Sequence, residues 1–329
     1  MSRTTWDGQT LDRRMQWATK RQLTNLVDLS APDPAKAVRR ARRSLAGAAL
    51  LGSRPSVATV GRIDIPGPAG PIPALQYMPR QPLDDPAVLL YFHGGGFALG
   101  SPKSHDTVNR HFAAYAGVQV ISVDYRMAPE HPFPAAIEDA MAAYDHVREH
   151  ADAFGIAPDR IAVSGDSAGG NITAVLGALA IHKPAYTVMF YPATDRTRTY
   201  PSYTSVADGL LLNREVLDWF IRMYVPDTAD LADPRISPAL APNLADFPPS
   251  YIATAGFDML RDEGEAFGRA LSEVGVSVVI RRHPSLIHGF ASATRFGLPG
   301  RDAMIEAAGA LRAGLALHSA SSQRESSAR

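Results

Sequence analysis

The sequence predicts an α/β fold, in which a mostly parallel sheet is flanked by helices. Two observations lead to this prediction: short apolar runs rich in Val and Ile recur along the chain, and helix-like stretches lie between them. Strands that are covered on both faces read as continuous apolar runs. Strand-helix alternation indicates parallel pairing, because a parallel pair needs a long crossover connection.

The expected elements follow in order along the chain. Two short strands are expected at 58–65 and 72–78. Six buried strands are then expected at 87–92, 118–123, 160–164, 186–191, 251–256 and 276–281. Helices are expected between them at Ala135–His150, Gly170–His182 and Asp262–Val274.

The N-terminal segment, residues 1 to about 55, is expected to be helical. It contains a cluster of four arginines: Arg39, Arg40, Arg42 and Arg43. We interpret this cluster as a solvated helix face. The alternative, a helix that lies on a lipid surface, would need a stronger apolar face than Val38, Leu45 and Leu50 provide.

The stretch between Tyr191 and Tyr251 is too long for a simple crossover. It contains a helix-like segment, Asn213–Tyr224, and a Pro-rich segment, 233–249. We interpret it as an insertion over the edge of the sheet. The polar residues of 318–329 are expected to form a disordered tail.

Composition and charge narrow the classes of function. The formal net charge of the 329 residues is +0, which argues against a nucleic-acid-binding protein. The chain has no cysteine, which excludes disulfides, zinc–thiolate sites and a cysteine nucleophile. The N-terminal sequence MSRTTWDGQTLDRRMQWATKR lacks the apolar segment of a signal peptide, and no apolar run is long enough for a membrane span. We expect a cytoplasmic protein without stable membrane insertion.

The segment Gly165-Asp166-Ser167-Ala168-Gly169 has the form G-x-S-x-G and lies between a predicted strand and a predicted helix. In a nucleophile elbow the serine occupies such a strand-to-helix turn, and the flanking glycines avoid collisions in it. The N-terminus of the following helix favours negative charge at the same point. Ser167 is therefore the candidate nucleophile.

Three consecutive glycines, in the segment His93-Gly94-Gly95-Gly96-Phe97, follow the strand at 87–92 directly. Each glycine costs backbone entropy, so the run indicates that backbone N–H groups approach a substrate closely. Acyl transfer needs such donors for its tetrahedral oxyanion. The expected donors are Gly95, Gly96 and Ala168, and Gly94 is a further candidate.

A serine nucleophile needs a base, and the base needs an orienting carboxylate. Four histidines follow Ser167 in the sequence: His182, His283, His288 and His318. We favour His288, in a loop before Gly289, over His283, which lies beside Pro284. Asp258, in a loop after a strand, is the preferred acid. Its rivals, Asp262 and Glu263, are better placed to begin the next helix.

Five motifs together resemble the hormone-sensitive-lipase family of carboxylesterases. They are HGGGF (93–97), DYRMAPEHPFPAA (124–136), GDSAGG (165–170), GFDMLRDEG (256–264) and IHGF (287–290). The resemblance implies an α/β-hydrolase fold with Ser167 as nucleophile, Asp258 as acid, His288 as base, and an oxyanion hole formed by the glycine loop and Ala168. No metal or other cofactor is implied.

The resemblance also implies a domain organisation and a substrate class. Residues 1–317 would form one domain, with a helical cap from about 1–55 and 192–248 and a catalytic core from 56–191 and 249–317. The expected partner is a small acyl ester with a short-to-medium acyl chain, and a homodimer is left open. Candidate cap-lining residues are Met15, Trp17, Leu210–Leu212, Trp219, Phe220 and Met223.

Three other functions remain as alternatives. Amidase or lactonase activity would use the same machinery. A hydrolase fold that only binds a small ligand usually lacks one member of the triad. The segment His146-Val147-Arg148-Glu149-His150 matches the inverted zincin pattern H-x-x-E-H, but its polar neighbours favour a solvent-facing helix end.

Overall fold

The computed structural model describes residues 4–18, 27–31, 33–45, 52–205, 212–295 and 299–327. Within these ranges the main sheet has eight strands in the order β10-β9-β8-β7-β5-β6-β4-β3. They are β3 (Thr59–Ile65), β4 (Ile72–Met78), β5 (Val88–Phe92), β6 (Gln119–Val123), β7 (Ile161–Asp166), β8 (Thr187–Phe190), β9 (Ser250–Phe257) and β10 (Val278–Ile287).

Neighbouring strands from β10 to β6 pair in parallel, and only the β6–β4 and β4–β3 pairings are antiparallel. The predicted mostly parallel sheet is therefore confirmed. β10 differs most from its prediction, since it continues through Pro284 to Ile287. A register shift between His283 and Ile287 accommodates the proline, which has no N–H to donate to the ladder.

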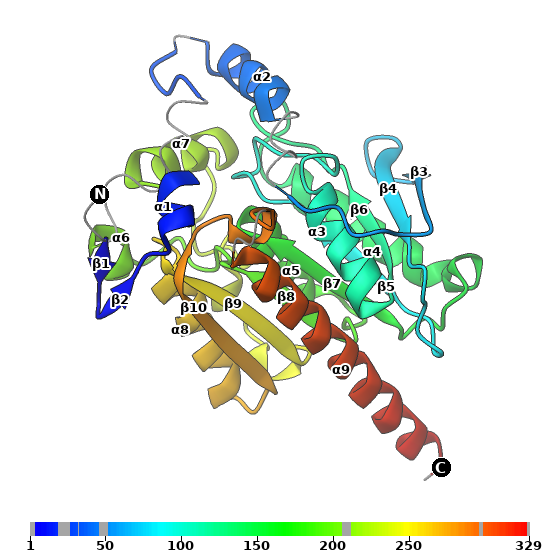
Figure 1. Cartoon of the computed structure of the whole chain (residues 1–329). Coiled ribbons are helices and arrows are strands. Elements are labelled where there is room, and N and C mark those ends of the chain that lie inside the picture. The colour runs from blue at the N-terminus through cyan, green and yellow to red at the C-terminus, as the bar shows by residue number, and fades with distance from the viewer. Residues whose placement is uncertain are drawn as a thin grey trace.

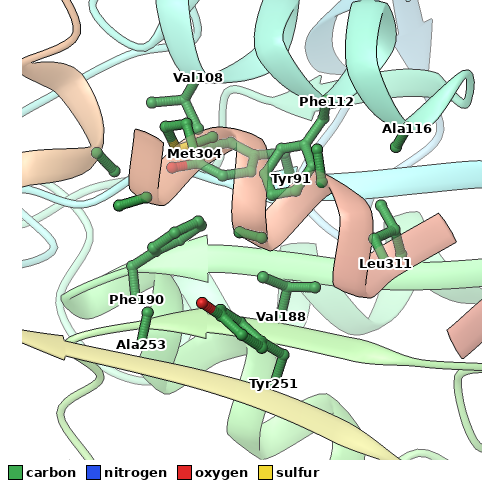
Figure 2. Packing of buried hydrophobic residues seen from close by; sticks show 14 of the residues in the cluster. Tyr91, Val108, Phe112, Ala116, Val188, Phe190, Tyr251, Ala253, Met304 and Leu311 are labelled. Atoms are coloured by element: carbon green, nitrogen blue, oxygen red, sulfur yellow. The ribbon is translucent and has the colours of Figure 1, made fainter. Parts of the chain in front are cut away.

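Helices cover both faces of the sheet (Figure 1). The covering helices are α3 (Asp106–His111), α4 (Ala135–Glu149), α5 (Ala168–Leu179), α8 (Arg261–Glu273) and α9 (Gly300–Ser327). In β5, Val88, Leu90 and Phe92 belong to the core under α4 and α5, whereas Leu89 and Tyr91 face α3 and α9. Figure 2 shows Met304 and Leu311 of α9 in this second core.

The N-terminal segment departs from the all-helical expectation. A short antiparallel hairpin, β1 (Thr5–Trp6) and β2 (Gln9–Thr10), precedes helices α1 (Arg13–Ala18) and α2 (Pro34–Leu45). Asp7 and Gly8 turn the hairpin with φ of 52° and 70°. An Asp-Gly pair with positive φ at both residues favours a two-residue hairpin, and this local signal outweighs helix propensity.

The insertion contains α6 (Ser202–Ser205) and α7 (Arg214–Tyr224). The helix predicted at Asn213–Tyr224 is confirmed, with the Asn213 side chain as N-cap accepting from the Val216 N–H at 2.9 Å. Short turns complete the elements: a π-helical turn at Phe112–Ala116 and 3₁₀ turns at Ala151–Phe154, Pro238–Leu240, Leu244–Asp246 and Phe290–Ser292.

One buried cluster joins α2 to α7 and to the chain beneath them, and both helices lie at the same end of the molecule in Figure 1. Its members include Val38 and Ala41 from α2, Trp219 and Phe220 from α7, and Leu99 from the core. Met15 instead packs in the core with Leu11. Trp17, Leu210 and Leu211, also named as cap-lining candidates, have side chains outside the described set.

The C-terminal segment also differs from its prediction, because α9 continues to Ser327 through most of the tail expected to be disordered. No Gly or Pro follows Gly314, so nothing in the sequence terminates the helix. Buried Arg160 donates to the Leu315 carbonyl at 2.7 Å and to Ser319 Oγ at 2.5 Å, which fastens this part of the helix to the core. No helix in the described ranges has the length and apolar character of a membrane span.

Candidate active site

The predicted site residues follow the ends of parallel strands. Ser167 comes directly after β7, Asp258 directly after β9 and His288 directly after β10, while the glycine loop follows β5. The carboxyl ends of parallel strands meet at one edge of a sheet. Residues far apart in the sequence are therefore brought to the same edge.

Ser167 occupies a strained turn between β7 and α5. Its φ is 56° and its ψ is −114°, values that an L-residue rarely adopts. A Cβ on Gly165 would lie 2.2 Å from the Gly169 carbonyl oxygen, and a Cβ on Gly169 would lie 1.8 Å from that of Phe92. The two glycines are therefore a steric requirement of this turn, as expected for a nucleophile elbow.

A chain of two hydrogen bonds joins the three predicted side chains. Ser167 Oγ lies 3.0 Å from His288 Nε2, and His288 Nδ1 lies 2.8 Å from Asp258 Oδ2. A carboxylate only accepts, so Nδ1 carries the proton and Nε2 is free to accept from the serine hydroxyl. The Leu260 N–H donates to the other Asp258 oxygen at 2.9 Å and helps to fix the carboxylate.

The alternative candidates for the base and the acid make other contacts and do not take part in this chain of hydrogen bonds. His283 lies within β10 with its ring 5.2 Å from that of Phe290. Asp262 accepts from the Ser202 N–H at 2.9 Å. Glu263, fully buried in the first turn of α8, accepts from Arg196, Tyr203 and two backbone N–H groups of the insertion. Both carboxylates thus fasten the insertion to α8.

The glycine loop adopts a conformation that side chains would obstruct. Gly95 and Gly96 have φ of 121° and 61°, and a Cβ on Gly96 would lie 2.2 Å from the Phe220 ring. Among the described residues, no backbone hydrogen bond is donated by the N–H groups of Gly95, Gly96 and Ala168. Gly94 was a further candidate donor to the oxyanion, but its N–H donates to Asp166 Oδ1 at 2.8 Å and is therefore not available to a substrate.

A buried polar network beneath this loop was not predicted. Asp166 Oδ1 also accepts from the Tyr91 hydroxyl at 2.6 Å and lies 3.3 Å from His105 Nε2. Burial alone would raise the pKa of Asp166, but the His105 charge and the hydrogen bonds from His105, Tyr91 and Gly94 lower it to about 2. Burial likewise opposes protonation of His105, yet the Asp166 charge and the hydrogen bonds to Asp166 and to the Ser101 carbonyl together outweigh it and raise the His105 pKa.

Tyr191 is a second residue that the sequence analysis missed. Its ring centroid lies 4.6 Å from that of His288, and its hydroxyl accepts from the Ala291 N–H at 3.3 Å. It is fully buried and has a φ of 36° immediately after β8. Its place at the carboxyl end of the predicted strand 186–191 is the signal that could have identified it.

The H-x-x-E-H segment lies at the C-terminal end of α4. The His146 and His150 rings are 4.3 Å apart, and His150 Nδ1 lies 3.0 Å from the His146 carbonyl oxygen. Across the described residues, no three His, Cys, Asp or Glu side chains are grouped in a way that could hold a metal ion. The segment therefore lacks a third ligand for zinc.

The fold and the residues at its strand ends define the class of this protein, an α/β hydrolase. The chain belongs to the α/β hydrolase fold family, because the sequence profile of that family matches residues 89–292. Carboxylic ester hydrolase LipN of Mycobacterium tuberculosis is 42% identical over 319 residues, which cover 94% of this chain and 84% of the relative.

Two further comparisons agree with this assignment. Ethyl acetate hydrolase of Pseudomonas putida is 41% identical over 220 residues, covering 64% of this chain and 69% of that protein. The structure of an esterase from Pyrobaculum calidifontis superposes with a TM-score of 0.84 at 35% identity, covering 92% of this chain and 98% of the other. The resemblance to the hormone-sensitive-lipase family of carboxylesterases is confirmed, and the chain is a hydrolase of the carboxylesterase class.

Proposed function

We propose that this protein hydrolyses carboxylic esters with Ser167 as nucleophile, His288 as general base and Asp258 as the residue that orients the histidine. The observation that carries the proposal is the chain of hydrogen bonds of 3.0 Å and 2.8 Å that joins these side chains. The names of the relatives, among them a carboxylic ester hydrolase and an ethyl acetate hydrolase, support the ester class.

The proposed reaction has two halves. The Ser167 oxygen bonds to the ester carbonyl carbon while His288 Nε2 takes the hydroxyl proton. The tetrahedral intermediate then expels the alcohol, which receives that proton from His288, and an acyl-enzyme remains. Water attacks the acyl-enzyme in the same way and releases the acid. Asp258, which is 1% exposed, stabilises the imidazolium in both halves.

The negative charge of each tetrahedral intermediate needs fixed donors. We assign this role to the N–H groups of Gly95, Gly96 and Ala168. Ala168 begins α5, so its N–H has no partner within the helix and lies at the positive end of the helix dipole. Gly94 is left out of this set because its N–H is already bonded to Asp166.

The helices α2 and α7 are proposed to form a cap over the site that sets acyl preference. Phe220 of α7 packs directly against the glycine loop, since a Cβ on Gly96 would lie 2.2 Å from its ring. A bulky aromatic side chain this close to the proposed oxyanion hole supports short-to-medium acyl chains. Faster turnover of long-chain triglyceride emulsions than of soluble esters would contradict this preference.

The decisive test is hydrolysis of a chromogenic acyl ester series by the wild-type, Ser167→Ala and Ser164→Ala proteins. Loss of the nucleophile is expected to lower kcat by roughly 10³–10⁶-fold. Ser164, a buried serine on β7, the strand that leads to Ser167, is a matched control and should retain most of the activity. Activity that survives in folded Ser167→Ala would exclude Ser167 as the nucleophile.

A further inference from the structure

The carboxylate of Asp166 lies directly beneath the glycine loop and receives three donors on one oxygen. The Tyr91 hydroxyl, the Gly94 N–H and His105 Nε2 lie 2.6, 2.8 and 3.3 Å from Asp166 Oδ1. Asp166 is 5% exposed and His105 is 9% exposed, so the interaction is largely shielded from water. A buried carboxylate needs such partners, because an unpaired charge in the interior is costly.

The surroundings of His105 favour a donor at each of its two ring nitrogens. Nε2 faces the Asp166 carboxylate, and Nδ1 lies 3.3 Å from the Ser101 carbonyl oxygen and 3.0 Å from Ser104 Oγ. The Ser104 hydroxyl has the Ser101 carbonyl oxygen as an acceptor at 2.8 Å, which leaves Ser104 Oγ to accept from the ring. A histidine with two acceptors is an imidazolium, and the pair is therefore ionic.

Three consecutive contacts, of which Asp166 makes the first, fix the peptide planes of the glycine loop one after another. Asp166 holds the Gly94 N–H, His93 Nδ1 lies 3.0 Å from the Gly94 carbonyl oxygen, and the Gly95 carbonyl accepts from Leu99 at 2.8 Å. A trans peptide is planar, with its C=O and N–H on opposite sides. Fixing the Gly94 and Gly95 carbonyls therefore fixes the directions of the Gly95 and Gly96 N–H groups.

The contact between the loop and the carboxylate leaves no room for adjustment. A Cβ on Gly94 would lie 2.4 Å from Asp166 Oδ2, so the backbone rests against the carboxylate itself. Asp166 also precedes Ser167, so one residue connects the position of the nucleophile with that of the loop. Movement of Asp166 would displace both.

We propose that the buried Asp166–His105 ion pair positions the glycine loop for stabilisation of the oxyanion, with both side chains acting as positioning residues. The inference rests on the proposed function and deepens it. Neither side chain touches the substrate. Their effect is to hold the donors of Gly95 and Gly96 in place before the charge develops.

The test compares Asp166→Asn, His105→Gln and the double variant with the wild-type enzyme. Asp106→Asn is the matched control, because it removes a paired carboxylate from α3, next to His105, that binds Arg54 and Arg110 instead. Each protein is assayed for kcat and KM on a soluble acyl ester. Inhibition by a trifluoromethyl ketone is measured as well, because its adduct with the serine carries an oxyanion.

We expect kcat to fall about 10- to 100-fold in Asp166→Asn and His105→Gln, with KM within about threefold of wild type. The inhibition constant of the ketone should rise in parallel with the loss in kcat, and Asp106→Asn should show neither change. The double variant should lose no more than the worse single variant, since the two side chains act as one unit.

Two results would overturn the inference: retention of kcat and ketone affinity in His105→Gln, or a fall in kcat with unchanged ketone affinity. If Asp166→Asn does not fold, the result for His105→Gln tests the inference by itself. This variant keeps the Asp166 carboxylate that accepts from the Gly94 N–H. Activity that survives in Ser167→Ala would instead overturn the proposed function, so the two failures are distinguishable.

Discussion

At the scale of single residues, the glycines of the elbow show how backbone contact constrains the sequence. Gly169 lies so close to β5 that a Cβ there would be 1.8 Å from the Phe92 carbonyl oxygen. No rotamer change relieves this clash, because both groups belong to the backbone. Gly169→Ala must therefore shift α5 or β5, and with it either Ser167 or the glycine loop.

We expect Gly169→Ala to lower the melting temperature and to lose at least tenfold in kcat/KM, measured by thermal unfolding and an ester assay. Gly309→Ala is the control, since Gly309 is exposed in α9 and a Cβ there meets nothing within 4 Å. That substitution should stabilise the protein by about 0.5–1 kcal/mol. Equal effects of the two substitutions would contradict the steric account.

Residues in the loops that follow strands of the sheet were the easiest to identify from the sequence. Ser167, Asp258 and His288 each come directly after a strand, and parallel topology brings them together. His105 and Tyr91 precede the nucleophile and act through Asp166, so a search downstream of Ser167 could not find them. Gly94 was kept as a further candidate donor, since a sequence pattern does not reveal that its N–H is already bonded to a buried carboxylate.

At the scale of elements, α2 is held to the core by one arginine as well as by apolar packing. Arg42 Nε donates to the Ala98 carbonyl at 2.8 Å, and its Nη2 donates to the Ala128 carbonyl at 2.7 Å. The sequence predicted a solvated face for the arginine cluster, and Arg42 departs from it because the carbonyls of the buried residues Ala98 and Ala128 need donors. The apolar side of α2, with Val38 and Ala41, faces α7.

Arg42→Ala should loosen α2, because hydrogen bonds from a charged donor contribute about 1.5–3 kcal/mol each. A loss of that size makes local opening at least roughly tenfold more frequent, so limited proteolysis near α2 should accelerate by that factor. Exposed Arg43 on the same helix provides the control substitution. Unchanged cleavage rates in Arg42→Ala would show that Arg42 is not needed to hold the helix.

At the scale of the whole molecule, the elements of the core could be predicted from the sequence better than those of the periphery. The five central strands, β5 to β9, were predicted because their buried runs are continuous, and the helices between them because the alternation is regular. The N-terminal hairpin and the end of α9 depend on local turn chemistry and on one long-range arginine contact, which composition does not show. The joining of α2 with α7 likewise depends on contacts between segments about 180 residues apart.

Because α2 and α7 pack together, the proposed acyl site is formed by residues of both the core and the proposed cap. Phe220 belongs to the cluster shared by α2 and α7, and its ring also bounds the glycine loop at Gly96. Phe220→Ala should open space beside the loop and raise kcat/KM for hexanoate relative to acetate esters by roughly tenfold, the value of one or two methylenes in an apolar pocket.

Val216→Ala is the matched substitution for this experiment, because Val216 is buried in the same cluster on the same helix. It should lower stability without changing the ratio of the two rates. If both variants shift the ratio equally, loosening of the cap would account for the preference. If neither variant shifts the ratio of the two rates, residues other than Phe220 determine the preference for acyl-chain length.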